Sequence, residues 1–146
     1  MKLLSTISLL LISLSSQSQK MDSKNFHSII KGTWTVEYAT VENGKLINIQ
    51  RQAPDTARID SEGLVKTIHL KDKYASIEKW GSYDNVKKVV YGKGIYDNLP
   101  EQQLELKVIS LDKDVIKFEV PTFDEDHPAN QGTMLIIYKR VRSNAR

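Results

Sequence analysis

The chain contains no cysteine among its 146 residues, and this absence excludes several chemistries at once. Disulfides, zinc sites built on thiolates, cysteine nucleophiles and a lipid-modified N-terminal cysteine all require that residue. An excess of one charge sign is also missing, because 21 Lys and Arg stand against 18 Asp and Glu, which leaves a formal charge of +3. Acidic residues interrupt every basic cluster, whereas a nucleic-acid-binding protein usually shows a concentrated basic stripe. We therefore expect no nucleic-acid partner.

The longest apolar run lies at the N-terminus. Leu3–Leu14 follows Lys2, and small residues at Ser16 and Ser18 fit a cleavage site directly after them. A run of about a dozen residues makes a helix of roughly 18 Å, which is too short for the ~30 Å hydrocarbon core of a membrane. Residues 1–18 are therefore predicted to be a signal peptide, with an uncleaved anchor as the alternative. Removing it would leave a periplasmic or secreted, typically bacterial, protein without a transmembrane segment.

Beyond residue 32 apolar and polar residues alternate, and this period is typical of strands with one buried face. The expected strands are Thr33–Val41, Leu46–Gln50, Leu64–Leu70, Tyr74–Trp80, Val86–Tyr96, Leu104–Val108, Ile116–Val120 and Thr133–Val141. The polar stretches Gln52–Gly63 and Pro121–Gly132 are predicted to be loops, the first of them alternatively an irregular edge. The one helical candidate is the short segment Ser23–Ile30.

Consecutive strands with one apolar face each must either close into a barrel or stack as two sheets. Closure removes exposed edges, and short turns favour an up-and-down order. We therefore predict an all-β fold, a single antiparallel up-and-down β-barrel of about eight strands over residues 32–142. An arm with a short helical turn (residues 19–31) precedes it, and a tail (143–146) follows. A two-sheet sandwich is the alternative.

The two ends of the predicted barrel resemble the lipocalin family. The segment Asn25–Trp34 contains the Gly-x-Trp motif of lipocalins, Gly32 and Trp34, directly after a short helical turn. Arg140 in the last strand is similar to the arginine of the family's closing strand, and the Gly44–Lys45 hairpin resembles those of small exported bacterial lipocalin-like domains. The resemblance implies a barrel in which Gly32, Trp34 and Arg140 are structural, with the guanidinium packed across the indole at the closed end.

Known catalytic motifs are scarce in the sequence. The three histidines are accompanied by no Gly-x-Ser-x-Gly elbow, so we predict no hydrolytic triad. His69 is interpreted as an ordinary barrel or surface residue. His127 stands among acidic residues in Phe123–Pro128, but the spacing of this segment matches no calcium-binding loop. We therefore expect no catalytic residue, no metal site and no cofactor.

Aromatic residues are concentrated on the predicted strands, where they would give a barrel an apolar inner wall with a few polar groups, as in many small-molecule pockets. We therefore expect a monomeric, non-enzymatic protein that binds a small apolar or amphipathic ligand. The predicted ligand contacts are Tyr38, Trp80, Tyr91, Phe118 and Tyr138. Among them Trp80 is expected at the barrel rim, whereas Trp34 is not expected to be a main contact. The alternative is an envelope interaction or structural module whose barrel is filled by its own side chains.

Overall fold

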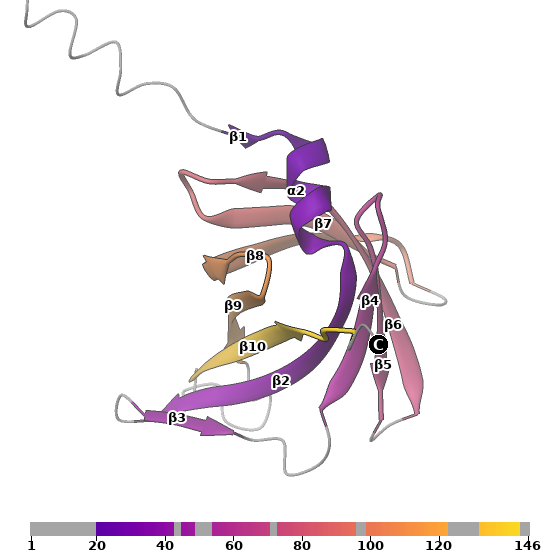
Figure 1. Ribbon diagram of the computed structural model, residues 1–146. Coiled ribbons are helices and arrows are strands. Elements are labelled where there is room, and N and C mark those ends of the chain that lie inside the picture. Colours follow the sequence, from indigo (N-terminus) through magenta and orange to yellow (C-terminus); the bar gives the residue numbers. More distant parts are fainter. Residues whose placement is uncertain are drawn as a thin grey trace, which may run out of the picture.

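The computed structural model describes residues 20–42, 45–48, 54–70, 73–95, 99–122 and 132–143, and the predicted signal peptide lies outside them. The described part is all-β apart from one short helix (Figure 1). The elements in chain order are β1 (Lys20–Met21), α2 (Ser23–Ile30), β2 (Gly32–Glu42), β3 (Lys45–Asn48), β4 (Asp55–Ile59), β5 (Leu64–His69), β6 (Tyr74–Asp84), β7 (Val89–Ile95), β8 (Gln102–Leu111), β9 (Val115–Thr122) and β10 (Gly132–Arg140).

Eight strands close into an antiparallel barrel, which confirms the predicted fold class. Their order around the barrel is β2, β4, β5, β6, β7, β8, β9 and β10, and β10 pairs with β2 from Met134 opposite Thr40 to Arg140 opposite Trp34. The short β1 and β3 pair outside this ring, with β6 and β2 respectively. Because the first and last barrel strands pair, the eight strands have no open edge, and the sandwich alternative is excluded.

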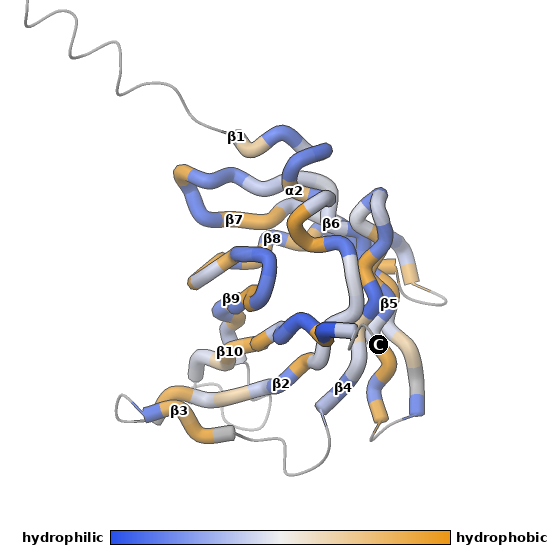
Figure 2. The backbone as a smooth tube through the Cα atoms, in the orientation of Figure 1, coloured by the Kyte–Doolittle hydropathy of each residue, from blue (hydrophilic) through white to orange (hydrophobic). Residues whose placement is uncertain are grey.

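Alternation along the strands directs every second side chain into the barrel, and apolar and polar segments alternate accordingly in Figure 2. On β2, for example, Trp34 and Val36 are fully buried, whereas Thr35 between them is not. Burial of such a side chain contributes about 1.5–3 kcal/mol to folding. The largest fully buried side chains are Trp34, Trp80, Phe26, Phe118, Ile30, Ile59, Ile116, Val36, Val65 and Val90.

The helix α2 lies at one end of the barrel, which we call the helix end. Asp22 caps it by accepting a hydrogen bond from the Lys24 N–H at 3.2 Å. Phe26 and Ile30, one turn apart, are fully buried, and the ring of Phe26 stacks on that of Tyr83 at 5.9 Å between centroids. The end of the barrel opposite the helix end, where β4 begins and β5 ends, is called the distal end. No helix among the described residues is long and apolar enough to cross a membrane.

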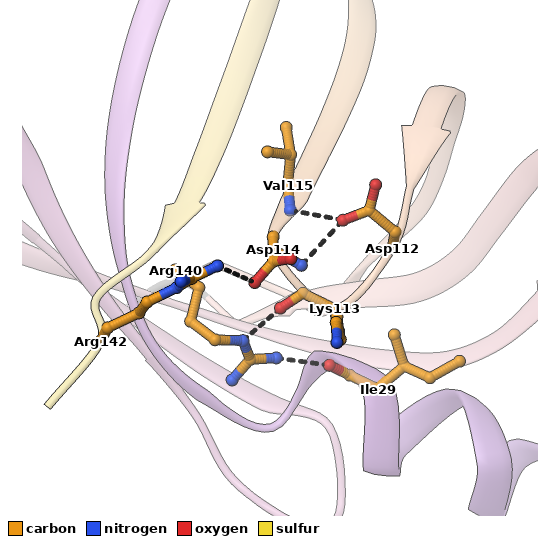
Figure 3. Close-up of polar contacts among 7 residues, drawn as sticks. All are labelled: Ile29, Asp112, Lys113, Asp114, Val115, Arg140 and Arg142. Atoms are coloured by element: carbon orange, nitrogen blue, oxygen red, sulfur yellow. Dashed lines mark hydrogen bonds and ion pairs between the residues drawn. The ribbon is translucent and has the colours of Figure 1, made fainter. Parts of the chain in front are cut away.

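Arg140 joins three segments at the helix end. Its guanidinium carbon lies 4.2 Å from the centroid of the Trp34 ring. The same group donates a hydrogen bond to the carbonyl oxygen of Lys31 at 2.6 Å. It also donates to the carbonyl oxygen of Ile29, at 2.6 Å, and to that of Lys113 in the β8–β9 turn (Figure 3). The contact with Trp34 is the one that the resemblance implies.

Gly32 makes this arrangement possible. Its φ of +146° belongs to the region that favours glycine, and a Cβ at this position would lie 2.2 Å from Nη1 of Arg140. The indole N–H of Trp34 donates to the Ile30 carbonyl at 2.8 Å, which ties β2 to the end of α2. Gly32, Trp34 and Arg140 therefore occupy one structural cluster.

Two predicted segments need correction. The stretch Gln52–Gly63, predicted to be a loop or an irregular edge, contains the barrel strand β4, whose inward residues are Asp55, Ala57 and Ile59. Because Asp55 is charged and Ala57 is small, the buried face of β4 lacks the regular apolar residues by which a strand is recognised in a sequence. The strand predicted from Val86 begins only at Val89, because residues 85–88 form a turn in which the Asp84 carboxylate accepts from two backbone N–H groups.

Candidate functional site

The barrel interior brings four of the five predicted ligand contacts together. Trp80, Phe118 and Tyr138 are buried and pack edge to face, with ring centroids 5.1 to 5.9 Å apart. Such pairs contribute about 0.5–1.5 kcal/mol beyond their burial. Tyr38 shares the inward face of β2 with Trp34 and packs against this core. We call the three edge-to-face rings the aromatic floor.

Trp80 does not lie at a rim, as the sequence had suggested. β6 continues beyond it to Asp84, because a β-bulge between Trp80 and Ser82 takes up Gly81 and the pairing with β7 resumes. The side chain of Trp80 is 0% exposed. The turn-like Gly81 therefore marks an irregularity within a strand and not the end of one.

Tyr91 is separated from the other four predicted contacts. Its neighbour Val90 is fully buried inside the barrel, and Tyr91 is opposite the exposed Glu105 of β8. Adjacent residues of a strand point to opposite faces, so Tyr91 lies on the outer face. The prediction that it lines the interior is wrong. The sequence could not decide this register, because both faces of the segment carry apolar residues.

A chain of polar side chains crosses four neighbouring strands inside the barrel. The hydroxyl of Tyr38 on β2 donates to Oδ2 of Asp55 on β4 at 3.2 Å. The same Oδ2 lies 2.9 Å from Nδ1 of His69 on β5, and Nε2 of His69 lies 2.9 Å from the hydroxyl oxygen of Ser76 on β6. Sequence reasoning named only Tyr38 of these four as a site residue. Strand pairing is what makes them neighbours.

Asp55 determines the orientation of this chain. It is 4% exposed and accepts hydrogen bonds from Tyr38, from Nδ1–H of His69, and from the Leu70 N–H at 3.2 Å. A buried carboxylate needs such donors. Because Nδ1 carries the proton that Asp55 accepts, Nε2 is the ring nitrogen that contacts the Ser76 hydroxyl.

Glu78 lies between this chain and the aromatic floor. One of its carboxylate oxygens accepts a hydrogen bond from the indole N–H of Trp80 at 2.8 Å. Burial raises the pKa of Glu78, while the hydrogen bond from Trp80 and the proximity of His69 act in the opposite direction. Burial dominates, so this carboxyl binds a proton more tightly than an exposed glutamate does.

Tyr138 links the aromatic floor to the polar groups. Its hydroxyl is hydrogen-bonded to Thr67, whose side chain also faces inward. Burial raises the pKa of Tyr138 well above its usual value, and the nearby charge of Glu78 acts in the same direction. The phenol is therefore neutral at physiological pH. We call this set the polar belt; it consists of Tyr38, Asp55, Thr67, His69, Ser76, Glu78 and Tyr138.

The polar belt can donate and accept hydrogen bonds inside an otherwise apolar barrel. The order Ser76, His69, Asp55 is also that of hydrolytic triads, in which a pair of donors for the developing oxyanion completes the site. Among the described contacts we find the relay without such a pair. The arrangement thus offers hydrogen-bond donors and acceptors to a polar group inside the barrel.

A second feature lies on the outside of the barrel. A concavity of about 560 Å³ is formed by side chains of β2, β8, β9 and β10 that point away from the core. Its lining residues are Val41, Ile109, Glu119, Gly132, Thr133 and Leu135. Val41 is 45% exposed and Ile109 is 51% exposed. This surface is amphipathic and separate from the polar belt.

In the described part of the chain, no three His, Asp or Glu side chains are grouped so that they could hold a metal ion. The acidic segment around His127 lies outside the described residues.

Neither a scan against protein-family models nor a search of curated proteins found a match to this chain.

Proposed function

We propose that this protein is an exported, lipocalin-like binding protein that holds a small amphipathic ligand inside its barrel and does not convert it. The observation that carries the proposal is the polar belt beside the aromatic floor. Sites for small molecules combine apolar and aromatic walls with a few well-placed polar groups. The ligand's apolar part would contact the aromatic floor, and its polar end would bind the belt.

Two further observations support a lipocalin-like protein. A short helix precedes the first barrel strand, and Arg140 covers Trp34 at the helix end, as the sequence resemblance implies. That end is occupied by these residues, so the distal end is the proposed route of entry. The apolar run in residues 1–18 supports export to the periplasm or beyond, and we propose that the mature protein acts as a monomer.

Binding can be tested with the neutral fluorescent probe N-phenyl-1-naphthylamine and a matched pair of variants. Tyr38→Phe removes a hydroxyl from the polar belt, whereas Tyr91→Phe removes one from the outer face. Loss of one hydrogen bond is worth about 0.5–1.5 kcal/mol, or roughly two- to tenfold in affinity. We therefore expect weaker binding of an amphipathic competitor to Tyr38→Phe and unchanged binding to Tyr91→Phe. A protein that takes up no probe, or equal losses in both variants, would contradict the proposal.

The second candidate is an envelope interaction module with a filled barrel. The outer concavity favours it, because exposed apolar side chains such as Val41 and Ile109 are typical of protein interfaces. The two candidates differ in where a ligand would act. The module would bind its partner through the outer concavity on β2, β8, β9 and β10. Any binding of the fluorescent probe would then be the same in Tyr38→Phe and in the parent protein.

A further inference from the structure

The ionised side chains that face the barrel interior are mainly acidic. Asp55 and Glu78 point inward, and His69 is the one base of the polar belt. In the described part of the chain, the lysines and arginines of the barrel strands are on the outer face, except for Arg140. Arg140 lies at the helix end, where three backbone carbonyls and the Trp34 ring surround its guanidinium. A ligand inside the barrel would therefore meet carboxylates and no lysine or arginine from the described strands.

The two carboxylates differ in how well they are satisfied. Asp55 accepts at least three hydrogen bonds, one of them from an imidazole. Among the described contacts Glu78 accepts one, from Trp80, and its side chain is only partly exposed. The residue opposite Glu78 on β7 is Gly94, which adds no side chain to the interior. Within the described contacts, Glu78 is therefore the carboxylate of the polar belt with unused acceptor capacity.

Aromatic rings lie next to this carboxylate. Trp80 contacts it through the indole N–H, and Tyr138 is close enough for the charge of Glu78 to affect its phenol. A buried carboxylate is stabilised by a cation, and the faces of aromatic rings attract an ammonium group. We propose that the polar end of the ligand is a protonated amine, which Glu78 binds beside Trp80 and Tyr138. This inference rests on the proposed function and adds the chemical class of the ligand.

An anionic ligand would fit this interior poorly. A carboxylate head group would lie near Glu78 and Asp55 in a medium where like charges repel strongly. A neutral alcohol could donate to Glu78 but would leave its charge uncompensated. Ligands with the same alkyl chain are therefore expected to rank amine first, alcohol second and carboxylate last.

Protons should compete with the amine. The groups next to Glu78 are Trp80, which donates its indole N–H, His69 and Tyr138. Lowering the pH protonates Glu78, and the loss of its negative charge opposes ammonium binding. Amine affinity should therefore decrease as the solution is acidified.

The experiment compares dodecylamine, dodecanol and dodecanoate, all below their micelle concentrations, as competitors of N-phenyl-1-naphthylamine on the purified protein. We expect dodecylamine to bind at least about tenfold more tightly than dodecanoate. Glu78→Gln should lower the amine affinity to that of dodecanol and leave the alcohol unaffected. The matched control is Glu105→Gln, which neutralises an exposed carboxylate on the outer face of β8 opposite Tyr91, and it should keep the amine preference.

The outcomes separate this inference from the proposed function. Dodecanoate binding as tightly as dodecylamine would overturn the inference and leave a binding protein. A folded Glu78→Gln variant that retains the amine preference would do the same. If none of the three competitors displaces the probe, the proposed function itself fails. The ranking of head groups on the unchanged protein remains decisive even if Glu78→Gln does not fold.

Discussion

At the scale of single residues, Arg140 has the widest set of partners at the helix end. It contacts the Trp34 ring and the carbonyls of Ile29, Lys31 and Lys113, so it connects the end of α2, β2 and the β8–β9 turn. Each carbonyl accepts from a planar guanidinium whose donors are held in a fixed geometry. A lysine would carry the charge without this geometry.

Replacing Arg140 by alanine should therefore weaken the fold. We expect Arg140→Ala to lower the free energy of unfolding by about 1–2 kcal/mol, from lost cation–π and packing interactions. Arg140→Lys should recover only part of this loss. Urea unfolding followed by tryptophan fluorescence measures both. The control is Arg58→Ala on the outer face of β4, which should change stability by less than about 0.5 kcal/mol. Equal unfolding midpoints for Arg140→Ala and the parent protein would contradict the structural role.

At the scale of elements, the turn between β4 and β5 positions Trp80. The Asp60 carboxylate accepts from the N–H groups of Glu62 and Leu64 at 2.8 and 2.9 Å, and these bonds lower the pKa of Asp60. Gly63 adopts a φ of +80° in this turn, and its carbonyl accepts from the Trp80 N–H at 2.9 Å. The turn thus holds β6 at the point where its bulge begins.

A side chain at Gly63 should disturb this junction. A Cβ there would lie 2.2 Å from the Trp80 carbonyl oxygen, in a backbone conformation unfavourable for alanine. We expect Gly63→Ala to cost about 1–3 kcal/mol in thermal or urea unfolding. Gly81→Ala is the matched control, since its Cβ would lie 3.6 Å from the Tyr91 carbonyl oxygen, an ordinary contact. A larger loss of stability in Gly81→Ala than in Gly63→Ala would refute this account.

At the scale of the whole molecule, the barrel encloses the polar belt within an otherwise apolar interior. The ionised form of Glu78 is disfavoured there, because burial is the main influence on its pKa and raises it. The folded protein binds the Glu78 proton more tightly than the unfolded chain does. This group therefore contributes stability below its ordinary pKa of 4.5, and the contribution is lost as pH rises through the raised value.

The pH dependence of unfolding tests this cost in the absence of ligand. We expect Glu78→Gln to lose less stability than the parent protein as pH rises from about 4 towards neutrality, because the variant has no carboxyl to ionise there. Urea midpoints across this range measure the difference, with Glu105→Gln on the outer face as the control. Parallel pH curves for Glu78→Gln and the parent protein would show that Glu78 ionises without a cost in the folded state.

The sequence by itself determined the class of fold. Alternation in Leu104–Val108 and Ile116–Val120 requires a sheet with one buried face, and the short turns between such segments favour a closed meander. Gly32, Trp34 and Arg140 could be named as a structural set because they match the motif that the lipocalin resemblance implies. Their contacts with one another nevertheless depend on the pairing of β10 with β2.

Only the tertiary structure decided which side chains meet inside the barrel. Asp55, His69 and Ser76 lie on three strands, and the pairing register turns all three to the same face. The same pairing leaves Tyr91 outside and continues β6 beyond Trp80 through a bulge. A shift of one residue in any strand would reverse every inward and outward assignment on it. The polar belt therefore depends on long-range hydrogen bonding between strands, which no local pattern in the sequence encodes.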